Sequence, residues 1–267
     1  MENLNNLVFK ILEELKTLNL ELLEIYNQDS IEFENKNDNS PVTKADLLSH
    51  DFLTKLLSEF NYPILSEESK ESFDRKTTET FWVIDPLDGT KDFLQKTDEF
   101  SIMIGLIHKG EVVLGVVSVP AKDKIYFATK GKGSYLLENG KQQKLKVLAV
   151  ETPERARIVV SRNHFSGEMK DFAEMYNMNL VKCGSNGVKV GILAEGKADF
   201  FFNPTDQMGI WDSCGPDIIL KEAGGLMTGV TGQPIDYTQS GVKNKFGIVS
   251  SNTILHSVLI DFCKNNV

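Results

Sequence analysis

The stretch TFWVIDPLDGTKDF, residues 80–93, carries the most informative pattern of this chain. Its apolar first half predicts a buried strand, and Pro86, which cannot donate a ladder hydrogen bond, is expected to end that strand. Asp85 and Asp88 flank the bend. A capping aspartate and a Pro-Gly turn would account for this pattern without any function. The same bend can also bring both carboxylates and the Leu87 carbonyl around one volume, as a hard divalent cation requires.

Gly89 and Thr90 follow at a position where a short helix is expected to begin. Backbone N–H groups at a helix N-terminus can hold a phosphate. Two unpaired carboxylates so close together would repel each other, and a bound cation removes that cost. The stretch is therefore compatible with a metal and phosphate site, although a simple capped turn remains open when the stretch is taken alone.

Three other stretches place acidic residues at the ends of predicted elements. Glu67 and Glu68 follow a short strand in LSEES, and Asp212 lies in the first turn of a helix in GIWDSCGPDIILKEAGG. In SPVTKADLLSH, Thr43 and Asp46 form a capping box. Solvated turns and helix caps would explain each stretch separately. With the opening stretch, four predicted elements carry acidic residues at one end. Such a set is more consistent with one shared cleft than with four unrelated caps, which favours the metal-site interpretation.

The composition excludes several classes of protein. The 267 residues include 29 Lys and Arg against 38 Asp and Glu, a net charge of −9, so a general nucleic-acid binder is not expected. The N-terminus lacks a basic signal segment, no apolar run is long enough to span a membrane, and the three cysteines form no C-x-x-C pair. We expect a cytoplasmic protein, peripheral at the inner membrane face at most, acting as a monomer or homodimer on a small molecule.

The pattern of elements changes near residue 150. Before it, β hairpins predominate after two N-terminal helices, and residues 28–40 suggest an exposed, mobile loop. After it, strands and helices alternate. The chain is therefore expected to have an α+β half over residues 1–150 and an α/β half over residues 151–267.

The stretches PVTKAD, LSEES, WVIDPLDGTKDF and WDSCGPDIILKEAGG together resemble the inositol monophosphatase superfamily. Its members are magnesium-dependent, lithium-sensitive phosphatases that act on small phosphate esters. The resemblance covers nearly the whole chain, and D-P-L-D-G-T combined with W-D and a later G-G is its most specific part. It implies a layered αβαβα sandwich, the inositol monophosphatase and fructose-1,6-bisphosphatase-like fold, with a metal cleft between the two halves.

Within the superfamily the chain most resembles the bacterial CysQ-type 3'(2'),5'-bisphosphate nucleotidases. Lys91 and Asp92 after the threonine, together with VVSRNH and GQPIDYT, carry this resemblance, whereas CGSNGVK departs from the usual pattern. The resemblance implies removal of the 3'-phosphate of adenosine 3',5'-bisphosphate to give AMP. Inositol monophosphatase activity, on inositol 1-phosphate or related sugar phosphates, remains the alternative.

The resemblance also implies a role for each site residue. Two or three Mg²⁺ ions would be ligated by Glu67, Asp85, the Leu87 carbonyl, Asp88 and Asp212. Asp46 and Thr90 would orient and deprotonate the attacking water beside Glu67. The scissile phosphate would be bound among these ligands by the backbone of Gly89 and Thr90. The rest of the nucleotide would be contacted by Ser161, His164, Ser185 and Lys189.

Two other readings of the motifs are disfavoured. Haloacid-dehalogenase phosphatases carry a D-x-D-G-T motif, but here the two aspartates are three residues apart and lie far from the start of the chain. A non-catalytic relative kept for ligand sensing would be expected to have lost a metal ligand or the water-activating pair. Each of those residues is present, so an active enzyme is expected.

Overall fold

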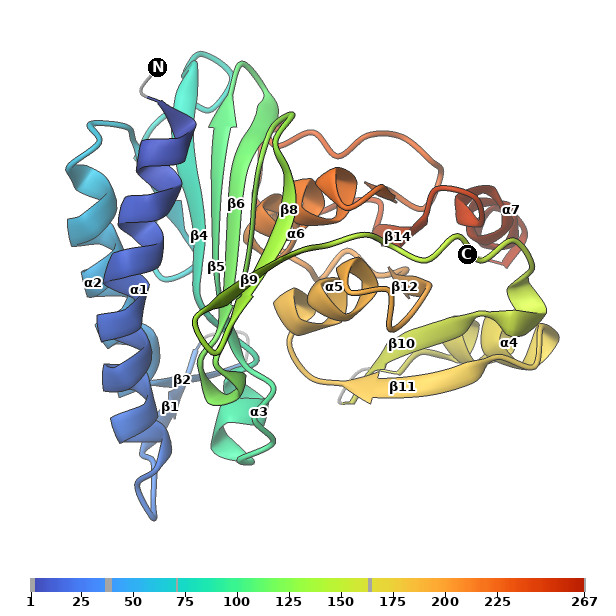
Figure 1. Ribbon diagram of the computed structural model, residues 1–267, viewed down its shortest axis with the longest axis horizontal. Coiled ribbons are helices and arrows are strands. Elements are labelled where there is room, and N and C mark those ends of the chain that lie inside the picture. Colours follow the sequence, from blue (N-terminus) through green and yellow to red (C-terminus); the bar gives the residue numbers. More distant parts are fainter. Residues whose placement is uncertain (1–2, 37–39, 71, 163–164, 267) are drawn as a thin grey trace.

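The computed structural model describes residues 3–36, 40–70, 72–162 and 165–266. Their helices and strands stack in five layers, with one pair of helices between two sheets and further helices on both outer faces (Figure 1). The predicted αβαβα sandwich is confirmed. The helices are α1 (Leu4–Tyr26), α2 (Lys44–Ser58), α3 (Thr90–Leu94), α4 (Gly167–Met175), α5 (Asn186–Ala194), α6 (Trp211–Glu222) and α7 (His256–Asn266), with short 3-10 turns at Pro120–Lys122 and Pro153–Arg155.

The strands belong to three sheets: a two-stranded hairpin, a seven-stranded sheet of order β3-β4-β5-β6-β7-β8-β9 and a five-stranded sheet of order β11-β10-β12-β14-β13. In the seven-stranded sheet only β3 and β4 are parallel. The strands are β1 (Phe33–Asn35), β2 (Pro41–Thr43), β3 (Ile64–Ser66), β4 (Thr80–Asp88), β5 (Ser101–His108), β6 (Glu111–Val119), β7 (Lys124–Thr129), β8 (Gly133–Glu138), β9 (Lys141–Lys144), β10 (Arg157–Ser161), β11 (Asn179–Cys183), β12 (Phe200–Asn203), β13 (Gly225–Thr228) and β14 (Ile248–Asn252).

Helices α1 and α2 cover the outer face of the seven-stranded sheet. Apolar residues at helical spacing along α1, among them Ile11 and Leu15, are fully buried. They share one core with Trp82 and Ile84 of β4. Burial of these α1 residues packs the N-terminal helices against the sheet whose strand β4 carries Asp85.

The inner face of the same sheet receives α6 at unusually close range. Gly105 of β5 pairs with Gly115 of β6. A Cβ at Gly105 would lie 2.2 Å from the Cys214 Sγ, and one at Gly115 would lie 2.3 Å from the Gly215 carbonyl. The two glycines therefore let α6 approach the sheet, and α6 begins at the segment that carries Asp212.

The five-stranded sheet completes the sandwich. Helices α5 and α6 lie between the two sheets, and α4 and α7 cover the far face (Figure 1). Phe172 of α4 contacts Phe200 of β12 and Phe262 of α7 through ring pairs with centroids 5.3 Å and 4.9 Å apart. The predicted alternation of strands and helices after residue 150 is confirmed.

The predicted boundary near residue 150 falls between β9 and β10, where the chain passes from one sheet to the other. Helices α5 and α6, which follow this boundary, nevertheless pack on the seven-stranded sheet. The two halves are thus joined by a shared helical layer. The division into an α+β half over residues 1–150 and an α/β half over residues 151–267 stays a proposal.

Two local predictions were wrong. Strand β4 does not end at Pro86 but continues to Asp88. Asp85 pairs with Met103 and Asp88 with Ser101, and the register shifts between these two pairs, so the strand passes the proline through a bulge. The stretch 28–40 is not all loop, because β1 pairs antiparallel with β2. Residues 37–39 lie outside the described part of the chain.

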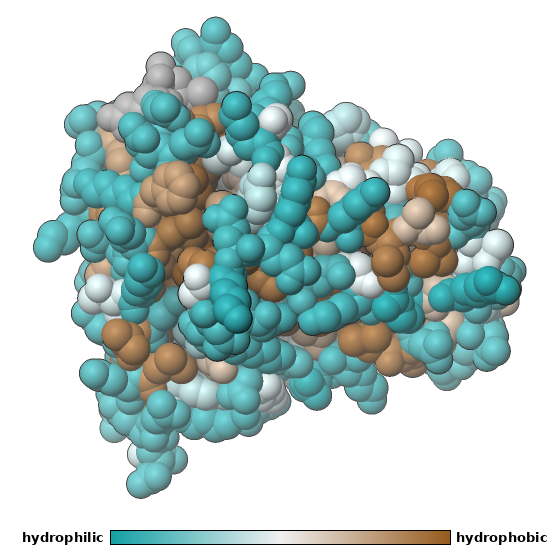
Figure 2. Space-filling model, viewed as in Figure 1, coloured by the Kyte–Doolittle hydropathy of each residue, from teal (hydrophilic) through white to brown (hydrophobic). Residues whose placement is uncertain are grey.

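The surface in view is mainly hydrophilic, with hydrophobic patches beside the N-terminal helices and over the five-stranded half (Figure 2). Phe9 and Leu20, both on α1, are among the exposed apolar side chains. Within the described residues, no helix combines the length and the apolar character that crossing a bilayer requires. The cysteines are buried and form no disulfide.

His256 makes the stability of the five-stranded half depend on pH. Its ring lies between the hydroxyls of Thr228 and Ser251, each 2.8 Å from a ring nitrogen. Burial lowers the pKa of His256 from 6.5 to about 4. The unfolded chain therefore takes up a proton near pH 6.5, whereas the folded protein does so only near pH 4. The contribution of neutral His256 to the free energy of unfolding is therefore fully present above pH 6.5 and is lost as the pH decreases from 6.5 to about 4.

We expect His256→Gln to flatten this pH dependence, because glutamine keeps a polar group but does not titrate. The measurement is the free energy of unfolding in urea at pH 7, 5.5 and 4.5. The exposed neighbour change Ser257→Ala serves as the control and should retain the wild-type slope. A His256→Gln slope equal to that of the wild type would contradict the assignment.

Candidate active site

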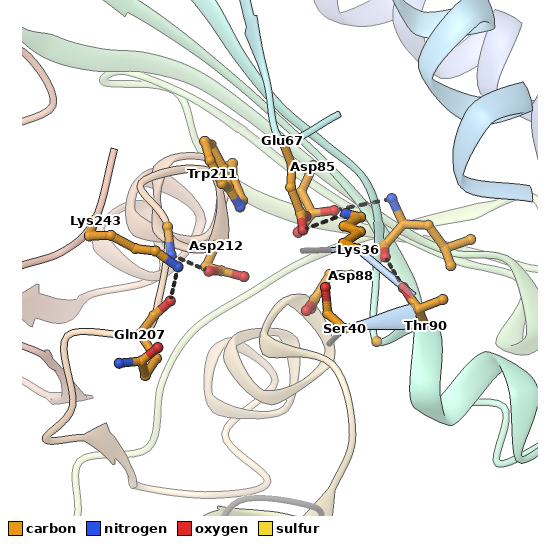
Figure 3. Close-up of a pocket in the computed structure, with 13 residues that line it drawn as sticks. Lys36, Ser40, Glu67, Asp85, Asp88, Thr90, Gln207, Trp211, Asp212 and Lys243 are labelled. Atoms are coloured by element: carbon orange, nitrogen blue, oxygen red, sulfur yellow. Dashed lines mark hydrogen bonds and ion pairs between the residues drawn. The ribbon is translucent and has the colours of Figure 1, made fainter. Parts of the chain in front are cut away.

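The site lies where the parallel strands β3 and β4 reach the same edge of the sheet. Ser66 pairs with Ile84, and the Glu67 N–H donates to the Ile84 carbonyl at 3.2 Å. Glu67 and Asp85 therefore emerge side by side (Figure 3). The Ser49 hydroxyl of α2 donates to the Pro86 carbonyl at 2.6 Å and so fixes the bulge that separates Asp85 from Asp88.

Asp212 reaches the same point from α6. Carboxylate oxygens of Asp85, Asp88 and Asp212 all lie within 4.8 Å of one another. Glu67, Leu87 and Thr90 line the same pocket. The predicted convergence of separate carboxylate-bearing element ends is thus found in the structure, between the end of β4 and the start of α6.

The clustered carboxylates raise one another's pKa. Burial first, and the neighbouring carboxylates second, raise the pKa of Asp85 well above its usual range. Loss of hydration in the cleft, followed by the Asp88 charge, raises the pKa of Asp212 to about 8. Burial also raises the pKa of Glu67, with Lys36 opposing the shift. A divalent cation would relieve this repulsion, and the all-oxygen donor set suits Mg²⁺.

A threonine backed by a buried carboxylate faces the cluster. The Thr90 hydroxyl donates to Asp46 Oδ1 at 3.0 Å and lies 3.3 Å from the Leu87 carbonyl. Asp46 Oδ2 accepts from the Thr43 N–H and hydroxyl, each at 2.7 Å, which confirms the predicted capping box. Burial raises the pKa of Asp46, and these hydrogen bonds oppose the shift. The raised pKa makes Asp46 a better proton acceptor.

Gly89 connects the metal-ligand stretch to α3 in a conformation that other residues rarely adopt. Its φ is 90°, and a Cβ there would lie 3.1 Å from the Glu99 carbonyl and 3.3 Å from Ser185 Cβ. Glycine at this position therefore allows the turn that presents Thr90. Phosphate binding by the backbone of Gly89 and Thr90 stays a prediction.

The second half of the chain holds the carboxylates in place. The Ser185 hydroxyl and the Gly187 N–H, at the start of α5, both donate to Asp88 Oδ2, the latter at 3.1 Å. The Asn186 side chain donates to Asp212 Oδ1 at 3.1 Å. One helix start thus orients two of the predicted metal ligands.

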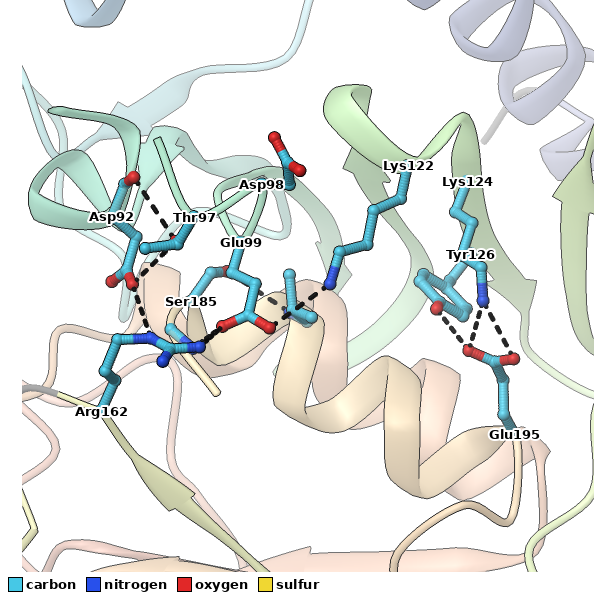
Figure 4. Close-up of polar contacts among 12 residues, drawn as sticks. Asp92, Thr97, Asp98, Glu99, Lys122, Lys124, Tyr126, Arg162, Ser185 and Glu195 are labelled. Atoms are coloured by element: carbon cyan, nitrogen blue, oxygen red, sulfur yellow. Dashed lines mark hydrogen bonds and ion pairs between the residues drawn. The ribbon is translucent and has the colours of Figure 1, made fainter. Parts of the chain in front are cut away.

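The turn before α5 is itself anchored by Glu99 (Figure 4). The Glu99 carboxylate accepts from the Gly184 N–H at 2.9 Å and from Arg162 at 2.7 Å, and its carbonyl accepts from the Ser185 N–H at 3.0 Å. Arg162 also lies 3.6 Å from Asp92. This network ties the end of β10 to the first half beneath the site.

Three of the four predicted nucleotide contacts lie within the described residues, and none of these lines the pocket. Ser185 is 2% exposed and serves Asp88 instead. Lys189 is 3% exposed, and its ammonium donates to the Gly184 carbonyl and to Asn186 Oδ1. Both side chains are buried, and direct contact of a ligand with Ser185 or Lys189 stays a prediction. Ser161 ends β10, away from the pocket lining, and His164 lies outside the described residues.

The pocket has further lining residues that the sequence reading missed, among them Lys36, Ser40, Gln207, Trp211 and Lys243. The Lys36 ammonium binds Glu67 at 3.1 Å and Glu68 at 2.5 Å.

Lys189→Met should lower kcat/KM about 10- to 100-fold, because loss of the ammonium loosens the turn that orients Asp88 and Asp212. The loss should be equal for a nucleoside bisphosphate and for a monophosphate. Steady-state kinetics on both substrates tests this, with Lys182→Met on the exposed face of β11 as the control. A loss confined to the bisphosphate would instead support direct contact of Lys189 with a phosphate.

Comparison with known proteins shows which family the chain resembles over its length. Residues 5–261 match the inositol monophosphatase family. A protein of Aggregatibacter actinomycetemcomitans named 3'(2'),5'-bisphosphate nucleotidase CysQ is 34% identical over 227 residues, which are 82% of this chain and 83% of that protein. The Escherichia coli (strain K12) protein of the same name is 33% identical over 208 residues, 76% of this chain and 82% of its own.

Solved structures share the fold. CysQ from Bacteroides thetaiotaomicron superimposes with a TM-score of 0.74 at 30% identity, covering 88% of this chain and 93% of that one. Staphylococcal inositol monophosphatase-1 superimposes with a TM-score of 0.86 at 18% identity, covering 100% and 97%. The second similarity concerns the fold alone. Both agree with the layered sandwich described above.

Proposed function

Because the chain belongs to the inositol monophosphatase family, we propose that it is a Mg²⁺-dependent, Li⁺-sensitive phosphatase that releases the 3'-phosphate of adenosine 3',5'-bisphosphate and leaves AMP. The observation that carries the proposal is the cluster of Asp85, Asp88 and Asp212 beside the Thr90–Asp46 pair. The names of the relatives at 33–34% identity support the nucleotide substrate.

Glu67, Asp85, the Leu87 carbonyl, Asp88 and Asp212 would hold two or three Mg²⁺ ions. When bound, these ions would neutralise the carboxylates, lower the pKa of a water molecule and stabilise charge on the phosphate in an in-line displacement. Asp88 would be kept in position by Ser185 and Gly187, and Asp212 by Asn186. The ligand set would therefore be oriented before substrate arrives.

Thr90 and Asp46 would handle the proton of the attacking water. The Thr90 hydroxyl already donates to Asp46 Oδ1 at 3.0 Å, so its oxygen can accept a proton from water while its own proton passes to Asp46. The raised pKa of Asp46 favours this transfer. The Thr43 N–H and hydroxyl hold Asp46 Oδ2 and leave Oδ1 directed at Thr90.

A phosphate-release assay of the purified protein tests the proposal. The substrates are adenosine 3',5'-bisphosphate, inositol 1-phosphate and fructose 1,6-bisphosphate, each with Mg²⁺, with Mg²⁺ and Li⁺, and with EDTA. We expect the nucleotide to be hydrolysed fastest, EDTA to stop turnover and Li⁺ to inhibit it. Faster turnover of inositol 1-phosphate would replace the nucleotidase proposal with inositol monophosphatase activity, and full activity in EDTA would refute the metal site.

A further inference from the structure

One face of α2 contacts three separate segments of the candidate active site. Asp46, Ser49 and His50 are spaced three and four residues apart, so they lie on the same side of the helix. Asp46 accepts from the Thr90 hydroxyl, and Ser49 donates to the Pro86 carbonyl. The third residue, His50, has no part in the proton transfer between Thr90 and Asp46, and its contact lies elsewhere in the site.

His50 reaches the segment that carries Glu67. Its Nδ1 lies 2.9 Å from the hydroxyl oxygen of Ser66, the last residue of β3. Ser66 is 0% exposed, and its hydroxyl oxygen also accepts from the Glu68 N–H at 3.3 Å. The hydroxyl proton is therefore available to Nδ1, which accepts it when the imidazole is neutral and carries its own proton on Nε2. His50, Ser66 and Glu68 form a continuous chain of hydrogen bonds.

This chain of hydrogen bonds holds the turn that carries Glu67. The Ser69 N–H closes the turn by donating to the Ser66 carbonyl at 3.3 Å, and the Glu68 N–H is held by the Ser66 hydroxyl. Removal of the imidazole would leave the buried hydroxyl without an acceptor for its proton, which costs free energy. The hydroxyl would then rotate toward another acceptor, and the backbone that follows Glu67 would be held less tightly.

The helix that supplies the imidazole is itself anchored. Ala45, Leu53 and Leu57 of α2 are each 0% exposed and belong to the same core as Trp82 of β4. The position of His50 relative to β3 and β4 is therefore fixed by packing. A side chain on such an element can hold its partner more closely than one on a loop can.

We propose that His50 is a positioning residue that, through Ser66, holds Glu67 in the orientation that binds a divalent cation. The inference rests on the proposed function, in which Glu67 is one of the Mg²⁺ ligands. Mg²⁺ demands nearly ideal octahedral geometry, so a small displacement of one carboxylate weakens its binding. Residues that support a metal ligand without touching the metal contribute about 10- to 100-fold to metal affinity or activity.

Calorimetric titration with Mg²⁺, and kcat as a function of Mg²⁺ concentration, test the proposal. His50→Leu should raise the dissociation constant for Mg²⁺ about tenfold, while kcat at saturating Mg²⁺ changes less than about threefold. His50→Asn, whose amide oxygen can accept from the Ser66 hydroxyl, should retain most of the affinity. Ser66→Ala gives the same test without altering α2, and because His50 acts through Ser66, the double variant should lose no more affinity than either single one.

His108→Leu is the matched control. The Nδ1 of His108 lies 2.8 Å from the hydroxyl of Thr80, the same kind of contact that His50 makes with Ser66. Thr80 begins β4, however, and Asp88 ends it, so this contact lies at the opposite end of the strand from the site. The dissociation constant for Mg²⁺ should therefore be unchanged in His108→Leu.

An equal rise of the dissociation constant in His50→Leu and in His108→Leu would overturn the inference, as would a loss of kcat in His50→Leu without a loss of Mg²⁺ affinity. If the wild type binds Mg²⁺ and His50→Leu and Ser66→Ala bind it equally well, the inference alone is refuted. If the wild type itself binds no Mg²⁺, the proposed function fails and the inference fails with it.

Discussion

Asp212→Asn should reduce phosphate release to background while leaving the protein folded. Asp212 contributes one of three carboxylates whose oxygens lie within 4.8 Å of one another, and asparagine removes its charge from the predicted metal site. If the metal contributes several kcal/mol to lowering the barrier, the loss is about 10³-fold or more. Phosphate release measures the loss of activity, and calorimetric titration with Mg²⁺ measures the loss of metal binding.

The fold should tolerate this change. The Asp212 charge is costly without a cation, as its pKa of about 8 indicates. Asparagine keeps one acceptor oxygen for the Gly209 N–H and loses the one that accepts from Asn186, a smaller cost than the buried charge. The thermal midpoint in EDTA should therefore be at or above that of the wild type. The exposed Asp261→Asn on α7 is the matched control and should leave activity and Mg²⁺ affinity unchanged. An Asp212→Asn enzyme with more than a tenth of wild-type activity would exclude Asp212 as a metal ligand.

Thr90→Ala should lower kcat by about 10²-fold, the usual size of a lost general-base contribution. The reason is the hydrogen bond from the Thr90 hydroxyl to Asp46, which alanine cannot form. Mg²⁺ affinity should change little, because the side chain is not among the predicted ligands. The measurements are kcat at saturating substrate and activity as a function of Mg²⁺ concentration.

Thr90→Ser keeps the hydroxyl and is the matched control, so it should recover most of the lost rate. Asp46→Asn gives a less direct test, because it also weakens the capping box of α2, at a cost of about 1 kcal/mol. If Thr90→Ala weakened Mg²⁺ binding more than it lowered kcat, or if serine failed to restore turnover, the proton-transfer role would be wrong.

The convergence of the carboxylates could be predicted from sequence because each lies where a strongly patterned element ends. Asp85 follows an apolar strand and Asp212 begins a patterned helix, so local signals locate both. The bulge at Pro86 could not be predicted, since it depends on the Ser49 hydroxyl of another element. Sequence patterns therefore located the clustered carboxylates but not the hydrogen bonds that position them.

The lysines show a second limit of prediction from the sequence. Lys189 was expected to meet a ligand, but tertiary packing places its ammonium 5.3 Å from the centroid of the Phe201 ring and buries it. Lys36 follows a three-residue strand in a polar stretch that carries no periodicity, and its pairing with Glu67 depends on contacts distant in sequence. The burial of Lys189 and the ion pairs of Lys36 arise from the assembled fold, so neither could be predicted from the local sequence pattern.

The hydrogen bond from Ser185 to Asp88 joins residues 97 positions apart, one at the start of α5 in the shared helical layer and the other at the end of β4. Contacts of such sequence separation form late, because the chain between them must first be ordered. A growing polypeptide that has only its seven-stranded sheet in place holds Glu67, Asp85 and Asp88 but lacks Asp212 and the groups that orient Asp88. The unfinished chain therefore does not possess the complete carboxylate cluster, and we expect the capacity to hydrolyse phosphate esters to arise only once the last third of the sequence has been synthesised and docked.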